Sequence, residues 1–211
     1  MSDPAVSHTA PTIAAPVLVD PTVAARAATP IPANSPGGWA VLGAVLIGAL
    51  VAVALGAFGA LHDPRFFAVG IAGFSSGTAA KAWLSTLVIA LALFQLGSAF
   101  VMYRLFPIIR TRSWISTAHV WSGRGAVLLS VPVAVHCLYA LGFQHSDDRV
   151  VFHSLFGCLF YGMFVTKMLL LTRKGLPGWV IPIAGGLLFF GLVYVWLTSA
   201  LWFFLANGLT F

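Results

Sequence analysis

Three histidines lie close together in the middle of the chain: His119, His136 and His153. His119 and His153 each stand four residues before a glycine, in the stretches HVWSG and HSLFG, and each adjoins a long apolar run. An imidazole can donate or accept a hydrogen bond, transfer a proton near neutral pH, or coordinate a metal ion. What these three rings do therefore depends on the elements that position them.

The composition indicates a membrane protein, since the chain is 60% hydrophobic and only 8% charged, with a mean hydropathy of +0.98. A soluble domain carries about a quarter charged residues. Five apolar windows are long enough to cross a hydrocarbon core of about 30 Å. They span residues 39–61, 82–105, 125–143, 151–171 and 179–206. Backbone groups in lipid must be satisfied within their own segment, and no window alternates like a barrel strand. We expect an all-α integral membrane domain, a five-helix bundle over residues 38–211.

Residues 1–37 differ from the rest of the chain. They are rich in Pro, Ala and Thr and show no helical period, so they are predicted to be a disordered tail. The Ala-rich, Lys-poor composition suggests a GC-rich bacterial genome and hence the bacterial inner membrane.

Basic residues cluster at two places that share one side of the predicted bundle. Three precede the third window and three end the fourth: Arg104, Arg110, Arg112, Lys167, Arg173 and Lys174. Cytoplasmic connections carry the excess of Lys and Arg. We therefore predict a multi-pass protein of the cell membrane with its N-terminus in the cytoplasm and its C-terminus outside. The chain has a net charge of +6. On this topology its basic residues face anionic membrane lipid, which we expect to be their partner rather than nucleic acid.

On this topology His136 and His153 both lie near the outer leaflet. The connection between their helices, 144–150, is short, so the two helices are expected to pack as a hairpin. Two histidines from facing helices are the ligands that a six-coordinate haem iron requires. Gly157, one turn after His153, would leave room for a flat macrocycle. His136 and His153 are the predicted metal ligands.

Other residues complete the candidate site. His62, at the outer end of the first helix, is an alternative ligand. His119 lies toward the cytoplasm and is expected to make a hydrogen bond, meet a lipid headgroup, or contribute a ligand together with another subunit. Arg124 could bind a haem propionate or a phospholipid. Cys137 and Cys158 are interpreted as small packing residues.

Part of the chain, residues 115–172, resembles known haem proteins. VFHSLFG resembles the element that opens a haem-binding helix in the transmembrane ascorbate-reducible b-type cytochromes, and AHVWSGRGAVLL is similar to the opening of a helix in ferric-reductase-like membrane domains. The resemblance implies noncovalently bound haem b and electron transfer, with His153 and His119 matching ligand positions and His136 taking the place of the second histidine of its helix. The second and fifth windows contain no histidine, so one haem is expected.

Three functions remain open from the sequence. The first is a small b-type cytochrome-like subunit of a larger membrane complex, an electron-transfer oxidoreductase component that exchanges electrons with a quinol or a redox partner protein. The second is a structural or assembly subunit without a cofactor, whose histidines join helices by hydrogen bonds. The third is a transporter, because GWVIPIAGG interrupts the last helix with Pro and Gly.

Overall fold

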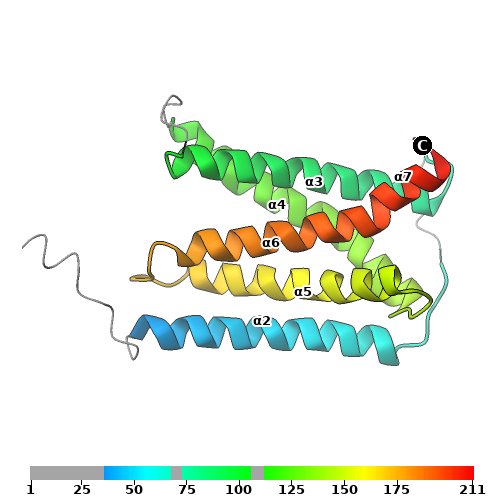
Figure 1. Cartoon of the computed structure of the whole chain (residues 1–211), viewed down its shortest axis with the longest axis horizontal. Coiled ribbons are helices and arrows are strands. Elements are labelled where there is room, and N and C mark those ends of the chain that lie inside the picture. The colour runs from blue at the N-terminus through cyan, green and yellow to red at the C-terminus, as the bar shows by residue number, and fades with distance from the viewer. Residues whose placement is uncertain (1–35, 68–72, 106–111) are drawn as a thin grey trace, which may run out of the picture. The chain divides into compact units, whose positions relative to one another are not determined.

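The computed structural model describes residues 36–67, 73–105 and 112–211. These residues form five helical runs that are long and apolar enough to cross a membrane (Figure 1). The runs are α2 (Pro36–Leu61), α3 (Gly77–Met102), α4 (Ser113–Val135) with the π-helix η1 (His136–Leu141), α5 (Asp148–Leu171), and α6 (Val180–Trp196) continued by the π-helix η2 (Leu197–Leu201) and α7 (Trp202–Asn207). No strand occurs in the described ranges. The predicted five-helix, all-α membrane bundle is confirmed.

The third helix differs most from its predicted bounds. It begins at Ser113, about three turns before residue 125. The polar residues of this stretch lower its hydropathy, but they do not interrupt the backbone hydrogen bonds of a helix. His119 and Arg124 consequently lie within α4 and not ahead of it. The predicted disordered tail falls almost wholly outside the described residues, as does Arg110.

Successive helices run in opposite directions, so the bundle has two distinct ends. The ends of α2, η1 and α7 lie at one end together with the starts of α3 and α5 (Figure 1); we call it the His153 end. The opposite end carries Arg104, Arg112, Arg173 and Lys174, and we call it the basic end. Which end faces the cytoplasm stays a prediction of the charge pattern.

The tightest helix packing joins α2 to α5. A Cβ added at Gly162 would meet the Gly48 carbonyl oxygen at 2.5 Å and the Ala52 Cβ at 2.9 Å. The Thr166 hydroxyl donates to the Gly162 carbonyl (3.0 Å) and approaches the Ala44 carbonyl (3.3 Å). Close approach of backbones at small residues is how membrane helices gain packing energy. This contact fixes the position of α5, which carries His153.

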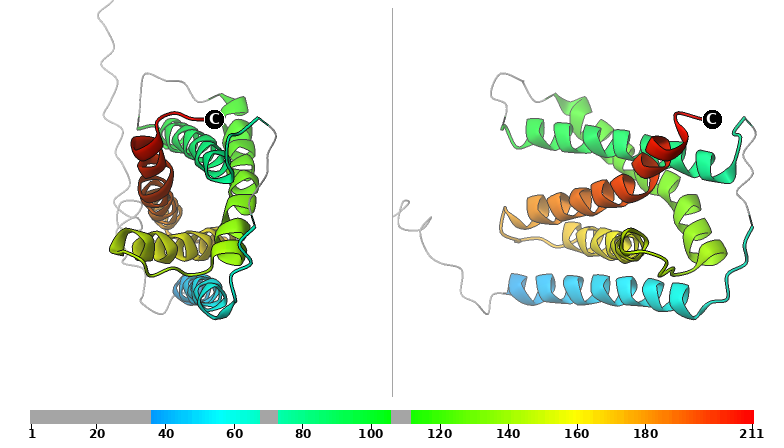
Figure 2. Two further views of the ribbon diagram at one scale, coloured as in Figure 1. Left: turned by 90° about the vertical axis from the view of Figure 1, so that its right-hand side faces the viewer. Right: turned by 45° about the vertical axis from the view of Figure 1, so that its right-hand side comes forward.

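The expected hairpin packing of the third and fourth spans is not observed along their length. Within the described residues, α5 packs against α2 and α6, whereas α4 packs along α3 (Figures 1 and 2). A hydrogen bond of 2.9 Å between the Ser130 and Tyr161 hydroxyls joins α4 to α5. A short connection requires two helices to approach only at the loop, and Gly142, with a φ of 69°, ends η1 there. Between the loop and this hydrogen bond, residues of α4, η1 and α5 line a common cavity.

Candidate functional site

The His153 end contains a cavity of about 310 Å³. Residues from all five helical runs line it, and most of them are apolar. Its lining residues with a charged or imidazole side chain are Lys81, Arg149 and His153. An apolar pocket of roughly 300–1,000 Å³ with a few convergent polar groups is the usual form of a small-molecule or cofactor site.

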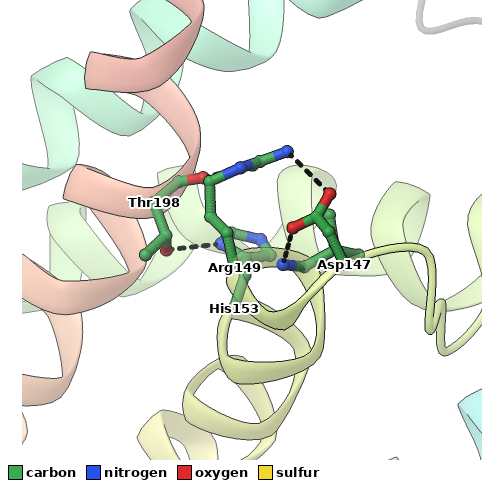
Figure 3. Close-up of polar contacts among 5 residues, drawn as sticks. Asp147, Arg149, His153 and Thr198 are labelled. Carbon is green, nitrogen blue, oxygen red and sulfur yellow. Dashed lines mark hydrogen bonds and ion pairs between the residues drawn. The ribbon is translucent and has the colours of Figure 1, made fainter.

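His153 lies on the cavity wall in the second turn of α5, and its orientation is fixed by η2. Its Nδ1 lies 3.1 Å from the Thr198 hydroxyl oxygen (Figure 3). The Thr198 hydroxyl can donate its single proton to the Tyr194 carbonyl at 2.8 Å or the Val195 carbonyl at 3.1 Å. With its proton used in either way, the hydroxyl oxygen accepts from His153 Nδ1–H. In a neutral imidazole this leaves the lone pair on Nε2, which is the arrangement of a metal-ligating histidine oriented by a second partner.

Two π-helices form part of the cavity wall. Cys137 belongs to η1 and Thr198 to η2, and both residues line the cavity. π-helical turns are rare and occur frequently at functional sites. In η2 the Thr198 carbonyl accepts a hydrogen bond of 2.7 Å from Arg149. Pro132 lies one turn before η1 and has no N–H to donate. The irregular backbone of η2 thus lies beside His153, and η1 lines the same cavity.

Arg149 is held at the cavity on three sides. Its guanidinium pairs with Asp147 at 3.6 Å (Figure 3) and lies 4.1 Å from the centre of the Trp202 ring; its third contact is the bond to Thr198. Asp147 itself caps α5 by accepting from the Val150 N–H at 3.0 Å. The first two turns of α5 therefore place Arg149 and His153 on the same wall.

His136 is buried, at the same level as His153. Each lies five residues from its helix terminus at this end, a depth of about 8 Å. Both nitrogens of His136 are engaged: Nε2 donates to the Phe67 carbonyl (2.7 Å), and Nδ1 accepts from the Lys81 ammonium (3.2 Å). His136 is not among the residues that line the cavity. The two imidazoles thus lie at one level, as predicted, but only His153 lies on the cavity wall.

The other predicted site residues are dispersed. Gly157 lines the cavity, with no atom within 4 Å of an added Cβ. His62 stacks between Phe58 and Tyr139, at 4.9 and 4.6 Å between ring centres, and its buried Nε2 has no hydrogen-bond partner. Arg124 lies over the Trp121 ring, at 5.1 Å from its centre. Neither His62 nor Arg124 reaches the cavity wall.

His119 lies toward the basic end, where it joins α4 to α3. Its Nδ1 lies 2.7 Å from the Ser98 hydroxyl, which donates to the Gln95 carbonyl at 3.0 Å. The His119 carbonyl accepts from the Gln95 side chain and from the Ser122 hydroxyl. The ring thus makes the interhelical hydrogen bond that was one of its predicted roles.

Sequence reasoning missed three residues of the cavity wall. Lys81, Arg149 and Thr198 line the cavity, and none of them was among the predicted site residues. The spacing of Arg149 and His153, one helical turn apart, was a signal that both share a face of α5. Cys137 and Cys158 also line the cavity.

Within the described ranges, no three His, Cys, Asp or Glu side chains meet in a group that could hold a metal ion. Haem ligation requires no such group.

Comparison with known proteins gives a family match for most of the chain. Residues 41–211 match the model of a family described as a family of unknown function (DUF6529). No curated protein and no solved structure matches the chain.

Proposed function

Because the chain belongs to the DUF6529 family, whose function is unknown, we propose its function from the site itself: it is a small b-type cytochrome-like membrane subunit that holds haem in the cavity and exchanges electrons with partners. The orientation of His153 carries this proposal. Its Nδ1–H is held by Thr198, which leaves the Nε2 lone pair for a ligand.

The kinds of side chain that line the cavity support haem b as its ligand. The volume of about 310 Å³ is at the lower end of the range for small-molecule sites and below that of a whole haem, so haem would occupy the cavity only with movement of lining side chains. Apolar side chains such as Val88 and Phe160 line the wall, as a porphyrin face requires. The Nε2 atom of His153 would hold the haem iron, and Gly157 adds no side chain one turn away. Bound haem would supply a one-electron redox couple.

His136 enters this proposal in two alternative ways. As the structure shows it, His136 is held by Phe67 and Lys81, so His153 alone would coordinate the iron. Release of those two hydrogen bonds would make His136 available as the second ligand predicted from the sequence. Haem held by His153 alone would be high-spin, and haem held by His153 and His136 together would be low-spin. The spectrum therefore distinguishes the two alternatives.

An electron-transfer subunit needs a source of electrons. No motif of the sequence indicates a flavin or nicotinamide site, so electrons would come from a quinol in the membrane or from a redox partner protein. The cavity lies at the His153 end, which the charge pattern predicts to face the outer leaflet. We propose that exchange occurs there, within a larger membrane complex surrounded by lipid.

The test is the haem b content of the purified full-length chain, produced in cells supplied with a haem precursor. We expect about one haem per chain in the wild type and little in a His153→Ala variant. His145→Ala is the matched control, because His145 is an exposed histidine at the same end and does not line the cavity. A wild-type protein that stays colourless with haem in excess would refute the proposal.

A cofactor-free structural or assembly subunit is the second candidate. The observation in its favour is that three histidines bond to other segments: His119 to Ser98, His136 to Phe67 and His153 to Thr198. Such bonds are worth about 0.6–2 kcal/mol each in membrane helices. This candidate predicts a colourless protein in which histidine substitutions lower stability by that amount and leave association with partner subunits intact.

A further inference from the structure

The charge of the cavity wall is not balanced by the described residues. Lys81 contributes a positive charge from α3 and Arg149 one from α5, and none of the described lining residues is acidic. A charge held against an apolar surface is costly unless an opposite charge or a set of hydrogen bonds compensates it. We therefore compare the hydrogen bonds and opposite charges that compensate each of the two cations.

Arg149 is compensated by Asp147 at 3.6 Å and by the Thr198 carbonyl at 2.7 Å. Lys81 has a neutral partner only, the Nδ1 of His136 at 3.2 Å. That nitrogen accepts one of the three ammonium protons, and the remaining two have no acceptor among the described residues. Lys81 is thus the cation at the cavity that lacks an anion.

The geometry points to an anionic amphiphile as the cavity's ligand, with a carboxylate bound by Lys81 and the apolar body against the apolar wall. Arg149 assists from α5, and His136 positions Lys81 through its Nδ1. The inference rests on the proposed function, in which haem is the occupant and its propionates supply the carboxylates. A fatty acid offers the same chemistry, and the experiment separates the two sources.

The first measurement needs no variant. Purified full-length protein in detergent is titrated with haem and with haem dimethyl ester, which keeps the iron and the porphyrin but lacks both carboxylates, and binding is followed by visible absorption. We expect the ester to bind at least about tenfold more weakly, the loss that removal of one charge-assisted hydrogen bond causes. Equal affinities for haem and ester would overturn the inference and leave the proposed function standing.

Variants then locate the carboxylate. Lys81→Gln removes the charge at nearly constant length and is expected to weaken haem binding about tenfold while leaving ester binding unchanged. Lys81→Arg restores the charge and should recover most of the affinity. Lys174→Gln is the matched control, an exposed lysine at the basic end. Wild-type affinity for haem in Lys81→Gln would contradict the role of Lys81.

Palmitate is the third probe, measured by calorimetry with the same variants. If neither haem nor its ester binds, the proposed function fails. Palmitate binding that Lys81→Gln weakens would then still support the carboxylate site. A protein that binds neither haem nor palmitate would overturn the inference together with the proposed function.

Discussion

Replacement of Gly48 by alanine tests the contact that positions α5. A Cβ at this buried position would meet the backbone oxygen of Gly162 and the hydroxyl of Thr166. A backbone atom cannot rotate away as a side chain can, so overpacking should cost the upper part of the usual range of about 1–3 kcal/mol. The better helix propensity of alanine returns about 1 kcal/mol. We expect a net loss of about 2 kcal/mol in the free energy of unfolding.

The assay is equilibrium unfolding in mixed detergent micelles, followed by the helical circular dichroism signal. Gly43→Ala is the matched control, because Gly43 also lies in α2 and an added Cβ there meets no atom within 4 Å. The control should be unchanged or more stable by up to about 1 kcal/mol. If Gly48→Ala is as stable as Gly43→Ala, the close α2–α5 approach is not a feature of the folded protein.

Three further predictions concern the polar side chains. Ser98→Ala removes the partner of His119 and should cost about 0.6–2 kcal/mol in the same unfolding assay without changing the haem content; an unchanged stability would mean that this bond contributes nothing. Thr198→Val removes the acceptor that orients His153, so haem affinity measured by absorption titration should fall about 10–100-fold; an undiminished affinity would argue against this orientation. In a variant whose other cysteine is serine, maleimide labelling of Cys137 should slow when haem is added, since the thiol lines the cavity, and an unaltered labelling rate would place haem elsewhere.

Much of the fold was predictable, because a helix that crosses the bilayer must be long and apolar, and hydropathy detects such segments in the sequence. Four of the five helices begin and end within about five residues of the predicted windows. The third was predicted too short, because its first turns contain polar residues such as Ser116 and Ser122, and a hydropathy window responds to composition and not to the continuity of backbone hydrogen bonds. The common level of His136 and His153 was also predictable, since helix rise converts sequence position into depth.

The chemistry of the site was less predictable, because it depends on contacts between distant segments. The free nitrogen of His153 is decided by the hydroxyl of Thr198, which lies in a π-helix on another span. The engagement of His136 depends on Lys81 and on a carbonyl of the connection after α2. The rotational setting of each helix, which the sequence pattern did not specify, determines these contacts.

The reduced-minus-oxidised visible spectrum of the purified full-length protein tests the central claim, that His153 holds haem in the cavity, most directly. The account predicts the absorption bands of haem b in the wild type and in His145→Ala, and their loss in His153→Ala. A flat difference spectrum for the wild type with haem in excess, or haem bands that persist in His153→Ala, would contradict it.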